Sequence, residues 1–449
     1  MNRKSDAAEP AHILRVEARP PRGRAGPAPC PRSPLTSRIA AAAVILLAAA
    51  AARSAPAEEA VETVHYRLVA AAPREEAEEL GRVLEAAWER FQAWFGAAPK
   101  LAQGEKLVVR LLPDLAAWEA GIRADGGTPP AGAGGYYWTG SRTAYLFRQP
   151  TIYYTRVLLL HEAAHQFHFL ARTNNRNPLA DWYTEGIAEY LSWHTWDGER
   201  LTLGVLPLLS LEDRAAGALT VVRDQSFDLA EVVEGKREAD RPLCWALFRF
   251  LAIGDQGKPV GRFPAFCRKM DAGGAAGPAF KGQFGQARAL RKKFHAWVEA
   301  EQQAWAPVFN EWEPIGDRRI RGVANVVSLC RLKAPANTLK ATLEVPGQAR
   351  FRGGLLLHFV DAGDYTTALV DEAGVVRVAR RANDAWVSLG TTRLEEGGGG
   401  VRLLHARRDG ARVRLEVDGR ACGEFELPGR TLGLAVEDCD LSFRDLEWN

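Results

Sequence analysis

Residues 158–190, LLLHEAAHQFHFLARTNNRNPLADWYTEGIAEY, contain two histidines four positions apart, with a glutamate directly after the first. On a helix, positions i and i+4 lie on the same face, so His161 and His165 can offer imidazole nitrogens to one metal ion. Glu162 is rotated by about 100° and lies beside that face, within reach of a water molecule at the metal. This is the spacing of the HExxH motif. The stretch therefore predicts a metal-binding helix.

The residues around this motif strengthen the prediction. The apolar runs before and after it continue a helix that is buried on its other side. A catalytic zinc needs a third protein ligand, and Glu185, in a second helix that opens near Asp181, is the candidate. Gly186 has no side chain to keep the two helices apart. Glu189, one turn after Glu185, can accept the outer N–H of a ligating histidine.

HExxH followed by a glutamate in the setting WYTEGIAEY resembles the gluzincins, the thermolysin-like and aminopeptidase-like zinc metallopeptidases. The resemblance implies that His161, His165 and Glu185 bind Zn²⁺, that Glu162 is the general base and that Glu189 holds a histidine. It covers roughly residues 70–305 and implies an α+β zincin-like domain, with a small N-terminal sheet, the active-site helix and a helical subdomain. The expected activity is that of an exported zinc-dependent metallopeptidase acting on a peptide or protein.

Other residues near the motif have less certain roles. His168 lies seven residues after His161, on the same helical face, and we expect it to be a packed histidine next to the site rather than a fourth ligand. Gluzincins use a tyrosine or histidine to stabilise the oxyanion, but residues 238–251 contain no tyrosine. Tyr153, Tyr154, Tyr183, Tyr190 and His194 are nearby in sequence.

Two alternatives remain open. The chain could be a surface-binding or adhesion protein whose zinc domain is vestigial. It could also be a hydrolase that uses the same metal site on ester or amide bonds other than those of peptides.

The chain has 449 residues, which favours two or three domains. Residues 1–57 hold nine Lys/Arg and three Asp/Glu, so their net charge is +6, while the whole chain has a net charge of only +3. The remainder is slightly acidic, with no basic stripe. Nucleic-acid binding is therefore not expected.

The N-terminal segment has the layout of a secretory signal peptide. Arg38 precedes an apolar run over residues 39–52, and Ala55, Pro56 and Ala57 supply small residues for cleavage after Ala57. The run is short for a membrane span of about 20 residues, so the membrane is a partner only if it is not cleaved. We expect an exported protein (periplasmic, cell-surface or extracellular) whose true start is near Leu35.

The hydrophobic pattern divides the rest of the chain into two regions. Residues 58–312 are predicted as the metallopeptidase-like domain, with a helix at 74–96, a strand at 106–113 and a hairpin at 135–148. Further helices are expected at 153–171, 181–194, 211–217, 242–253 and 286–305. Residues 314–316 are predicted as a linker.

Residues 316–449 contain many short alternating runs separated by Gly, Asp and Pro, which indicates an all-β sandwich. The order of the Asp418-Gly419 turn, residues 429–434 and residues 443–446 resembles concanavalin-like jelly-roll domains. That resemblance implies an accessory domain for targeting or docking, with a polysaccharide or cell-surface ligand. The candidate aromatics are Tyr365, Trp386 and Trp448, although each could simply be a core or edge residue.

Five cysteines follow residue 57, without CxxC spacing, so neither a structural zinc cluster nor a redox motif is expected. Disulfides 244–267 and 330–439 or 422–439 are compatible with export. Buried free thiols are an equally good interpretation.

Overall fold

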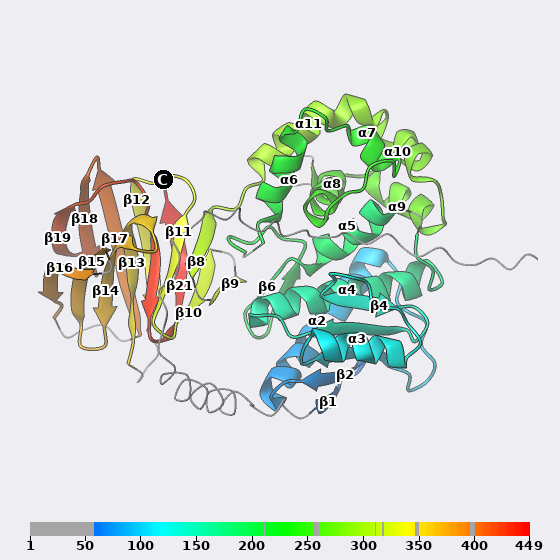
Figure 1. Ribbon diagram of the computed structural model, residues 1–449, viewed down its shortest axis with the longest axis horizontal. Helices are drawn as coiled ribbons and strands as arrows, with labels where there is room; N and C mark the ends of the chain where they lie inside the picture. The colour runs from blue at the N-terminus through cyan, green and yellow to red at the C-terminus, as the bar shows by residue number, and fades with distance from the viewer. Residues whose placement is uncertain are drawn as a thin grey trace, which may run out of the picture.

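The computed structural model describes residues 58–449, except 179, 211, 255–259, 310, 317, 346–349, 384 and 396–399. Figure 1 shows an α/β part and a helical part stacked on one another, with a separate β-sandwich beside them. The predicted multidomain organisation, an α/β region followed by a C-terminal sandwich, is confirmed. The predicted signal peptide and the possible membrane anchor lie outside the described residues. Within these residues, no helix is long and apolar enough to span a membrane.

The α/β part is built on a five-stranded sheet in the order β1-β2-β3-β5-β4. The central strands β2 (Tyr66–Ala71), β3 (Leu107–Leu112) and β5 (Thr143–Phe147) are parallel, and β1 (Glu58–Glu62) and β4 (Gly135–Trp138) are antiparallel edges. Parallel strands need helical crossovers, which α2 (Arg74–Phe95) and α3 (Leu115–Ala124) supply. The predicted hairpin is the pair β4–β5, so its first strand forms an open sheet edge.

The metal-binding motif lies on α4 (Ile152–Arg172), which packs against α2, β4 and β5. Thr151 caps this helix by accepting a hydrogen bond from the Tyr154 amide. Most of its side chains are buried on every side, which is typical of a helix in the centre of a domain. The next helix, α5 (Asp181–Ser192), packs on α4 on one side and on α8 on the other.

The helical part follows a short hairpin of β6 (His194–Trp196) and β7 (Leu201–Leu203). It contains α6 (Arg214–Arg223), α7 (Leu229–Val233), α8 (Arg241–Ile253), α9 (Phe263–Asp271), α10 (Ala276–Phe284) and α11 (Ala287–Ala300). The helix predicted at 211–217 begins instead after Asp213, because that side chain caps the Ala216 amide. The helix predicted at 286–305 ends at residue 300.

The sandwich consists, within the described residues, of two seven-stranded antiparallel sheets. One has the order β19-β18-β17-β12-β21-β10-β9, and the other β16-β15-β14-β13-β20-β11-β8. The first comprises β9 (Glu311–Gly316), β10 (Arg319–Val323), β12 (Thr338–Glu344), β17 (Val401–Asp409), β18 (Arg412–Val417), β19 (Arg420–Glu426) and β21 (Asp440–Trp448). The second comprises β8 (Trp305–Phe309), β11 (Val327–Leu332), β13 (Arg352–Asp361), β14 (Asp364–Asp371), β15 (Val375–Ala382), β16 (Ala385–Arg393) and β20 (Gly433–Glu437).

The sandwich starts earlier than the predicted boundary. Its first strand begins at Trp305, and the predicted linker at 314–316 lies within β9. The alternation in this segment is interrupted by Pro307 and Pro314, which is why its strands were not recognised in the sequence. The proposed disulfides are also absent: all five cysteines of the described chain are free.

The sandwich and the rest of the molecule are joined by packing and by buried charge. Leu209 belongs to the hydrophobic core of the sandwich, and the Trp305 amide donates to the Leu208 carbonyl at 3.2 Å. Arg156, on the metal-motif helix, contacts Glu313 of β9 at 2.5 Å, and both side chains are only 3% exposed. The sandwich therefore also helps to fix the position of α4, the helix that carries the motif.

Candidate metal centre

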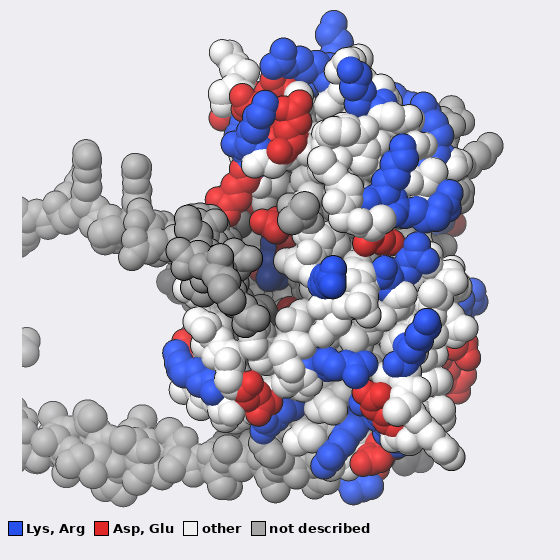
Figure 2. Space-filling view, turned by 90° about the vertical axis from the view of Figure 1, so that its right-hand side faces the viewer, with Lys and Arg blue, Asp and Glu red and all other residues white. Residues whose placement is uncertain are grey.

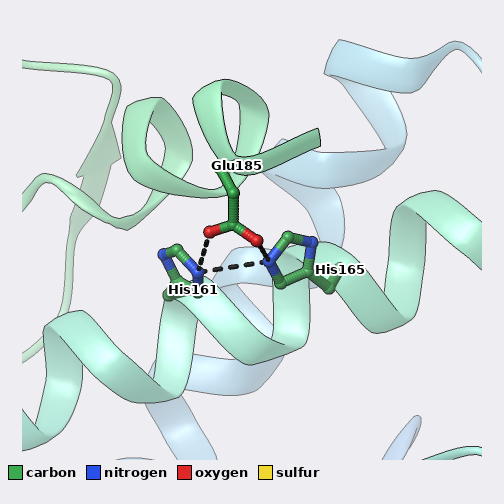
Figure 3. A group of neighbouring side chains, drawn as sticks. All are labelled: His161, His165 and Glu185. Carbon is green, nitrogen blue, oxygen red and sulfur yellow. Dashed lines mark hydrogen bonds and ion pairs between the residues drawn. The ribbon is translucent and has the colours of Figure 1, made fainter. Parts of the chain in front are cut away.

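Three side chains from two helices converge on one point (Figure 3). His161 and His165 project from successive turns of α4, and the Glu185 carboxylate approaches them from α5. The two histidine Nε2 atoms are 3.1 Å apart. Glu185 Oε2 lies 3.3 Å from His161 Nε2, and Glu185 Oε1 lies 3.5 Å from His165 Nε2. The structure thus brings together the three predicted ligands.

These distances match the edges of a tetrahedral zinc site. With metal–ligand bonds of about 2.0–2.1 Å, neighbouring ligand atoms of a tetrahedron lie roughly 3.3–3.4 Å apart. The separation of 3.1 Å between the histidines, and those of 3.3 and 3.5 Å from the histidines to the two different oxygens of Glu185, are close to this value. Two imidazoles and one carboxylate also form a known catalytic ligand set, which leaves one position open. By geometry and donor type, the residues fit a zinc ion.

The centre is buried on its histidine side and open on its glutamate side. His161 and His165 are 2% and 7% exposed, whereas the Glu185 side chain is 36% exposed. Burial favours the neutral form of Glu185, but the two imidazoles outweigh it and hold the pKa of this carboxyl well below its ordinary value. A hollow lies at the height of α4 and α5 between the helical and the α/β parts, with acidic and basic residues around it (Figure 2).

Glu162 lies beside the centre and against the edge strand β4. Its side chain is buried, and this burial raises the pKa of its carboxyl. Gly135 begins β4, and a Cβ at that position would lie 2.5 Å from Glu162 Oε1. Only glycine therefore allows the strand to pass so close to the carboxylate. The role of Gly135 was not predicted from the sequence, although the glycine at the start of GYYW is a usable signal.

Glu189 lies behind the histidines, as predicted. Its Oε1 atom is 3.6 Å from His161 Nδ1, and the side chain is 1% exposed. Arg214 contacts the carboxylate with two nitrogens, at 3.0 and 3.4 Å, and Arg241 lies 3.5 Å away. Burial favours the neutral form of Glu189, but these charges lower its pKa. The ionised carboxylate is in position to orient the His161 ring.

His168 takes no part in the metal centre. Its Nε2 lies 2.8 Å from Asp271 of α9, which also accepts from Arg172 and from the Tyr183 hydroxyl. Burial lowers the pKa of His168. His168 packs next to the site, as expected, and its hydrogen bond with Asp271 connects α4 to α9.

Three of the four tyrosines named as possible oxyanion donors have hydrogen-bond partners elsewhere in the structure. Tyr153 donates to the His194 carbonyl, Tyr154 contacts the Glu212 amide, and Tyr183 contacts Asp271.

A second recess lies on the sandwich, on the sheet that contains β14, β15 and β16. It has a volume of about 540 Å³ and is lined among others by Arg352, Tyr365, Arg377, Trp386 and Glu437. Trp386 is 52% exposed and packs edge-on against the buried Tyr365, with ring centroids 5.6 Å apart. The third predicted aromatic, Trp448, lies on the other sheet.

Comparisons with known proteins give weak structural likenesses only. No family model matches the chain, and no curated protein matches its sequence. A carbohydrate-binding module, CBM66 from Bacillus subtilis, is 18% identical, with 32% of this chain and 93% of that chain covered and a TM-score of 0.28. The GH43 protein BlXynB from Bacillus licheniformis is 15% identical, covering 31% of this chain and 35% of that chain, with a TM-score of 0.26. A putative glycosyl hydrolase from Parabacteroides distasonis is 11% identical, covering 32% and 86%, with a TM-score of 0.24.

These findings contradict one prediction from the sequence. The enzymes among the similar structures are described as glycoside hydrolases, including a β-fructofuranosidase from Aspergillus kawachii, and the comparisons give no support to a metallopeptidase. The classification of the chain as a zinc metallopeptidase is therefore wrong by this comparison and is withdrawn. The HExxH spacing suggested a metallopeptidase because this motif is found in that class. The motif describes only how a metal ion is bound, and different hydrolytic reactions can use the same arrangement of ligands.

Proposed function

We propose that this is an exported carbohydrate-binding hydrolase that uses a zinc ion at His161, His165 and Glu185 to cleave ester or amide bonds on a glycan. The observation that carries the proposal is the set of three ligand separations, 3.1, 3.3 and 3.5 Å, with the buried Glu162 beside them. The sandwich supplies the glycan-binding surface. Export follows from the predicted signal peptide.

The residues of the site have separate roles in the proposed hydrolysis. His161, His165 and Glu185 would hold the zinc ion, which would lower the pKa of a water molecule towards 7 and polarise the carbonyl group of the substrate. Glu162 accepts the proton of the attacking water, because burial raises its pKa above that of an ordinary carboxyl. It then delivers this proton to the leaving oxygen or nitrogen. Glu189 orients His161, and Gly135 leaves room for the Glu162 carboxylate.

The recess on the sandwich is the proposed glycan site. Sugar rings stack on exposed aromatic faces and accept hydrogen bonds from planar donors, and the recess offers Trp386 together with Arg352 and Arg377. The similar structures include a carbohydrate-binding module and galectins, and the proposed polysaccharide ligand agrees with them.

The reaction is tested by metal analysis and hydrolysis assays on the purified full chain. We expect one zinc per chain, and turnover of p-nitrophenyl acetate, an acetylated polysaccharide or an N-acetylated oligosaccharide. Glu162→Gln should retain the zinc and lose roughly 100-fold or more in kcat, since the general base is removed. Zinc without turnover would favour a surface-binding protein instead. Cleavage restricted to an unglycosylated peptide library would contradict the proposed substrate class.

The glycan site is tested by binding to a panel of immobilised polysaccharides. Trp386→Ala should weaken binding about 10-fold or more, because the stacking face is lost, and should leave zinc content unchanged. Trp94→Ala is a matched control, since Trp94 is exposed at 36% but lies on α2, away from the sandwich. Equal binding by Trp386→Ala and the unmodified chain would rule out this recess.

A further inference from the structure

The proposed reaction places negative charge on the substrate oxygen, and Tyr153, Tyr154 and Tyr183 have hydrogen-bond partners elsewhere. A cationic or N–H donor is needed there, because an oxyanion in a partly buried site is otherwise poorly stabilised. The described residues around the centre include two arginines, Arg214 and Arg241, that approach it through Glu189.

The two arginines differ in how they use their donors. Arg214 forms a two-nitrogen contact with Glu189 and its side chain is only 12% exposed, so it serves that carboxylate. Arg241 makes one long contact, 3.5 Å from Nη1 to Glu189 Oε1, and its side chain is 36% exposed. A guanidinium group has five N–H donors. Within the described chain this contact is the single ion pair of Arg241, so most of its donors have no ion-pair partner.

The position of Arg241 also links it to the reacting groups. It begins α8, and α8 packs closely on α5 because Gly186 lies against the Cys244 carbonyl and the Phe248 side chain. Its charge acts on Glu189, Glu185 and Glu162 together. Burial disfavours the charged form, but these three carboxylates raise the pKa of Arg241, so the guanidinium is permanently charged. The same Glu189 oxygen, Oε1, lies 3.5 Å from Arg241 Nη1 and 3.6 Å from His161 Nδ1, so a single carboxylate separates Arg241 from a predicted metal ligand.

We propose that Arg241 is the catalytic residue that binds the oxyanion formed from the substrate carbonyl, a role that rests on the proposed hydrolase function. The water oxygen bonds to the carbonyl carbon, its proton passes to Glu162, and the π electron pair moves onto the carbonyl oxygen. Arg241 donates N–H groups to that oxygen. The carbonyl then re-forms, the bond to the leaving oxygen or nitrogen breaks, and that atom takes the proton from Glu162.

The test uses inorganic phosphate as a tetrahedral oxyanion probe on the Co²⁺-loaded full chain, followed by the visible spectrum. Arg241→Met should weaken phosphate binding about 10- to 100-fold, as expected for loss of a charge-assisted hydrogen bond, and Arg241→Lys should lose less. The spectrum without phosphate should not change. Arg214→Lys should instead weaken Co²⁺ binding and leave the phosphate affinity of the loaded protein unaltered.

Two outcomes would overturn the inference, and they distinguish a failure of the Arg241 role from a failure of the proposed function. If Arg241→Met binds phosphate as tightly as the unmodified chain, Arg241 has no oxyanion role although the metal centre stands. If the unmodified chain binds no Co²⁺, the proposed function fails and the role of Arg241 fails with it. In kinetics on an ester probe, a loss of about 100-fold or more in kcat with little change in KM supports the proposal. A change in KM alone contradicts it.

Discussion

Histidines on or next to the metal-motif helix have two kinds of environment. His161 and His165 face a carboxylate, and the carboxylate of Glu185 outweighs burial and raises the pKa of His165. His194 has no such partner: burial and the charge of Arg156 lower its pKa to about 3. Its Nδ1 lies 2.8 Å from the Ser192 carbonyl, so this nitrogen carries the proton of the neutral ring.

The first prediction concerns acid sensitivity at His194. Its folded pKa of about 3 lies below the unfolded value of about 6.5, so the unfolded chain binds the proton more readily. The contribution of the neutral ring to stability is complete above pH 6.5 and is lost as the pH falls towards 3. Between pH 7 and pH 4.5 we expect the free energy of unfolding to fall by about 2–3 kcal/mol from this group.

Denaturant unfolding at several pH values measures this effect, and His194→Asn is the control. Asparagine keeps an N–H donor near the Ser192 carbonyl and cannot be protonated in this range. The difference in stability between pH 7 and pH 4.5 should be smaller in the variant by the stated amount. Equal pH dependence in both proteins would show that His194 is already protonated or exposed when folded.

At the scale of elements, the packing of α5 on α8 positions Glu185. A Cβ at Gly186 would lie 2.7 Å from Phe248 Cβ and 2.9 Å from the Cys244 carbonyl oxygen. Gly186→Ala must therefore push the two helices apart. We expect a loss of about 1–3 kcal/mol in stability despite the higher helix propensity of alanine, together with weaker zinc binding.

Gly121→Ala in α3 is the matched control for this prediction. A Cβ there meets only the Tyr145 ring, at 3.9 Å, which is ordinary contact. This change should stabilise the protein by about 0.5–1 kcal/mol through helix propensity alone. Thermal unfolding and zinc titration separate the two variants. If Gly186→Ala changed neither stability nor zinc binding, α5 and α8 would not be as close as described.

At the scale of the whole molecule, a buried charge cluster joins the sandwich to the metal-motif helix. Arg156 contacts Glu79 at 2.9 Å and Glu313 at 2.5 Å, and Glu313 also contacts Arg321 at 3.1 Å. Glu313→Gln leaves the Arg156 charge without one of its buried partners, and we expect a loss of about 2–4 kcal/mol.

The exposed pair Arg74–Glu78, with side chains 68% and 45% exposed, supplies the control. Glu78→Gln should change stability by less than about 0.5 kcal/mol. Because Arg156 lies on the helix of the metal ligands, Glu313→Gln should also lower zinc affinity. If urea unfolding shows the sandwich destabilised while zinc binding is untouched, the two halves are not coupled through this cluster.

Local patterns in the sequence were sufficient to select His161, His165 and Glu185, which the structure brings together, and to divide the chain into an α/β part and a β-sandwich. HExxH places two imidazoles one turn apart by helix geometry. Glu185 was predicted from the setting TEGIAEY, and the packing of α5 on α4 brings it to the histidines. Alternating runs between turn residues likewise predict strands without any knowledge of their partners.

Other features were decided only by the tertiary structure, because they depend on contacts between residues far apart in sequence. The close passage of Gly135 by Glu162, the approach of Arg241 to Glu189 and the pairing of His168 with Asp271 each join different elements. The start of the sandwich at Trp305 depends on the partner strand β11, not on local alternation. The sequence pattern shows which face of a helix or strand carries a functional side chain. Tertiary packing decides which residues of other elements that side chain contacts.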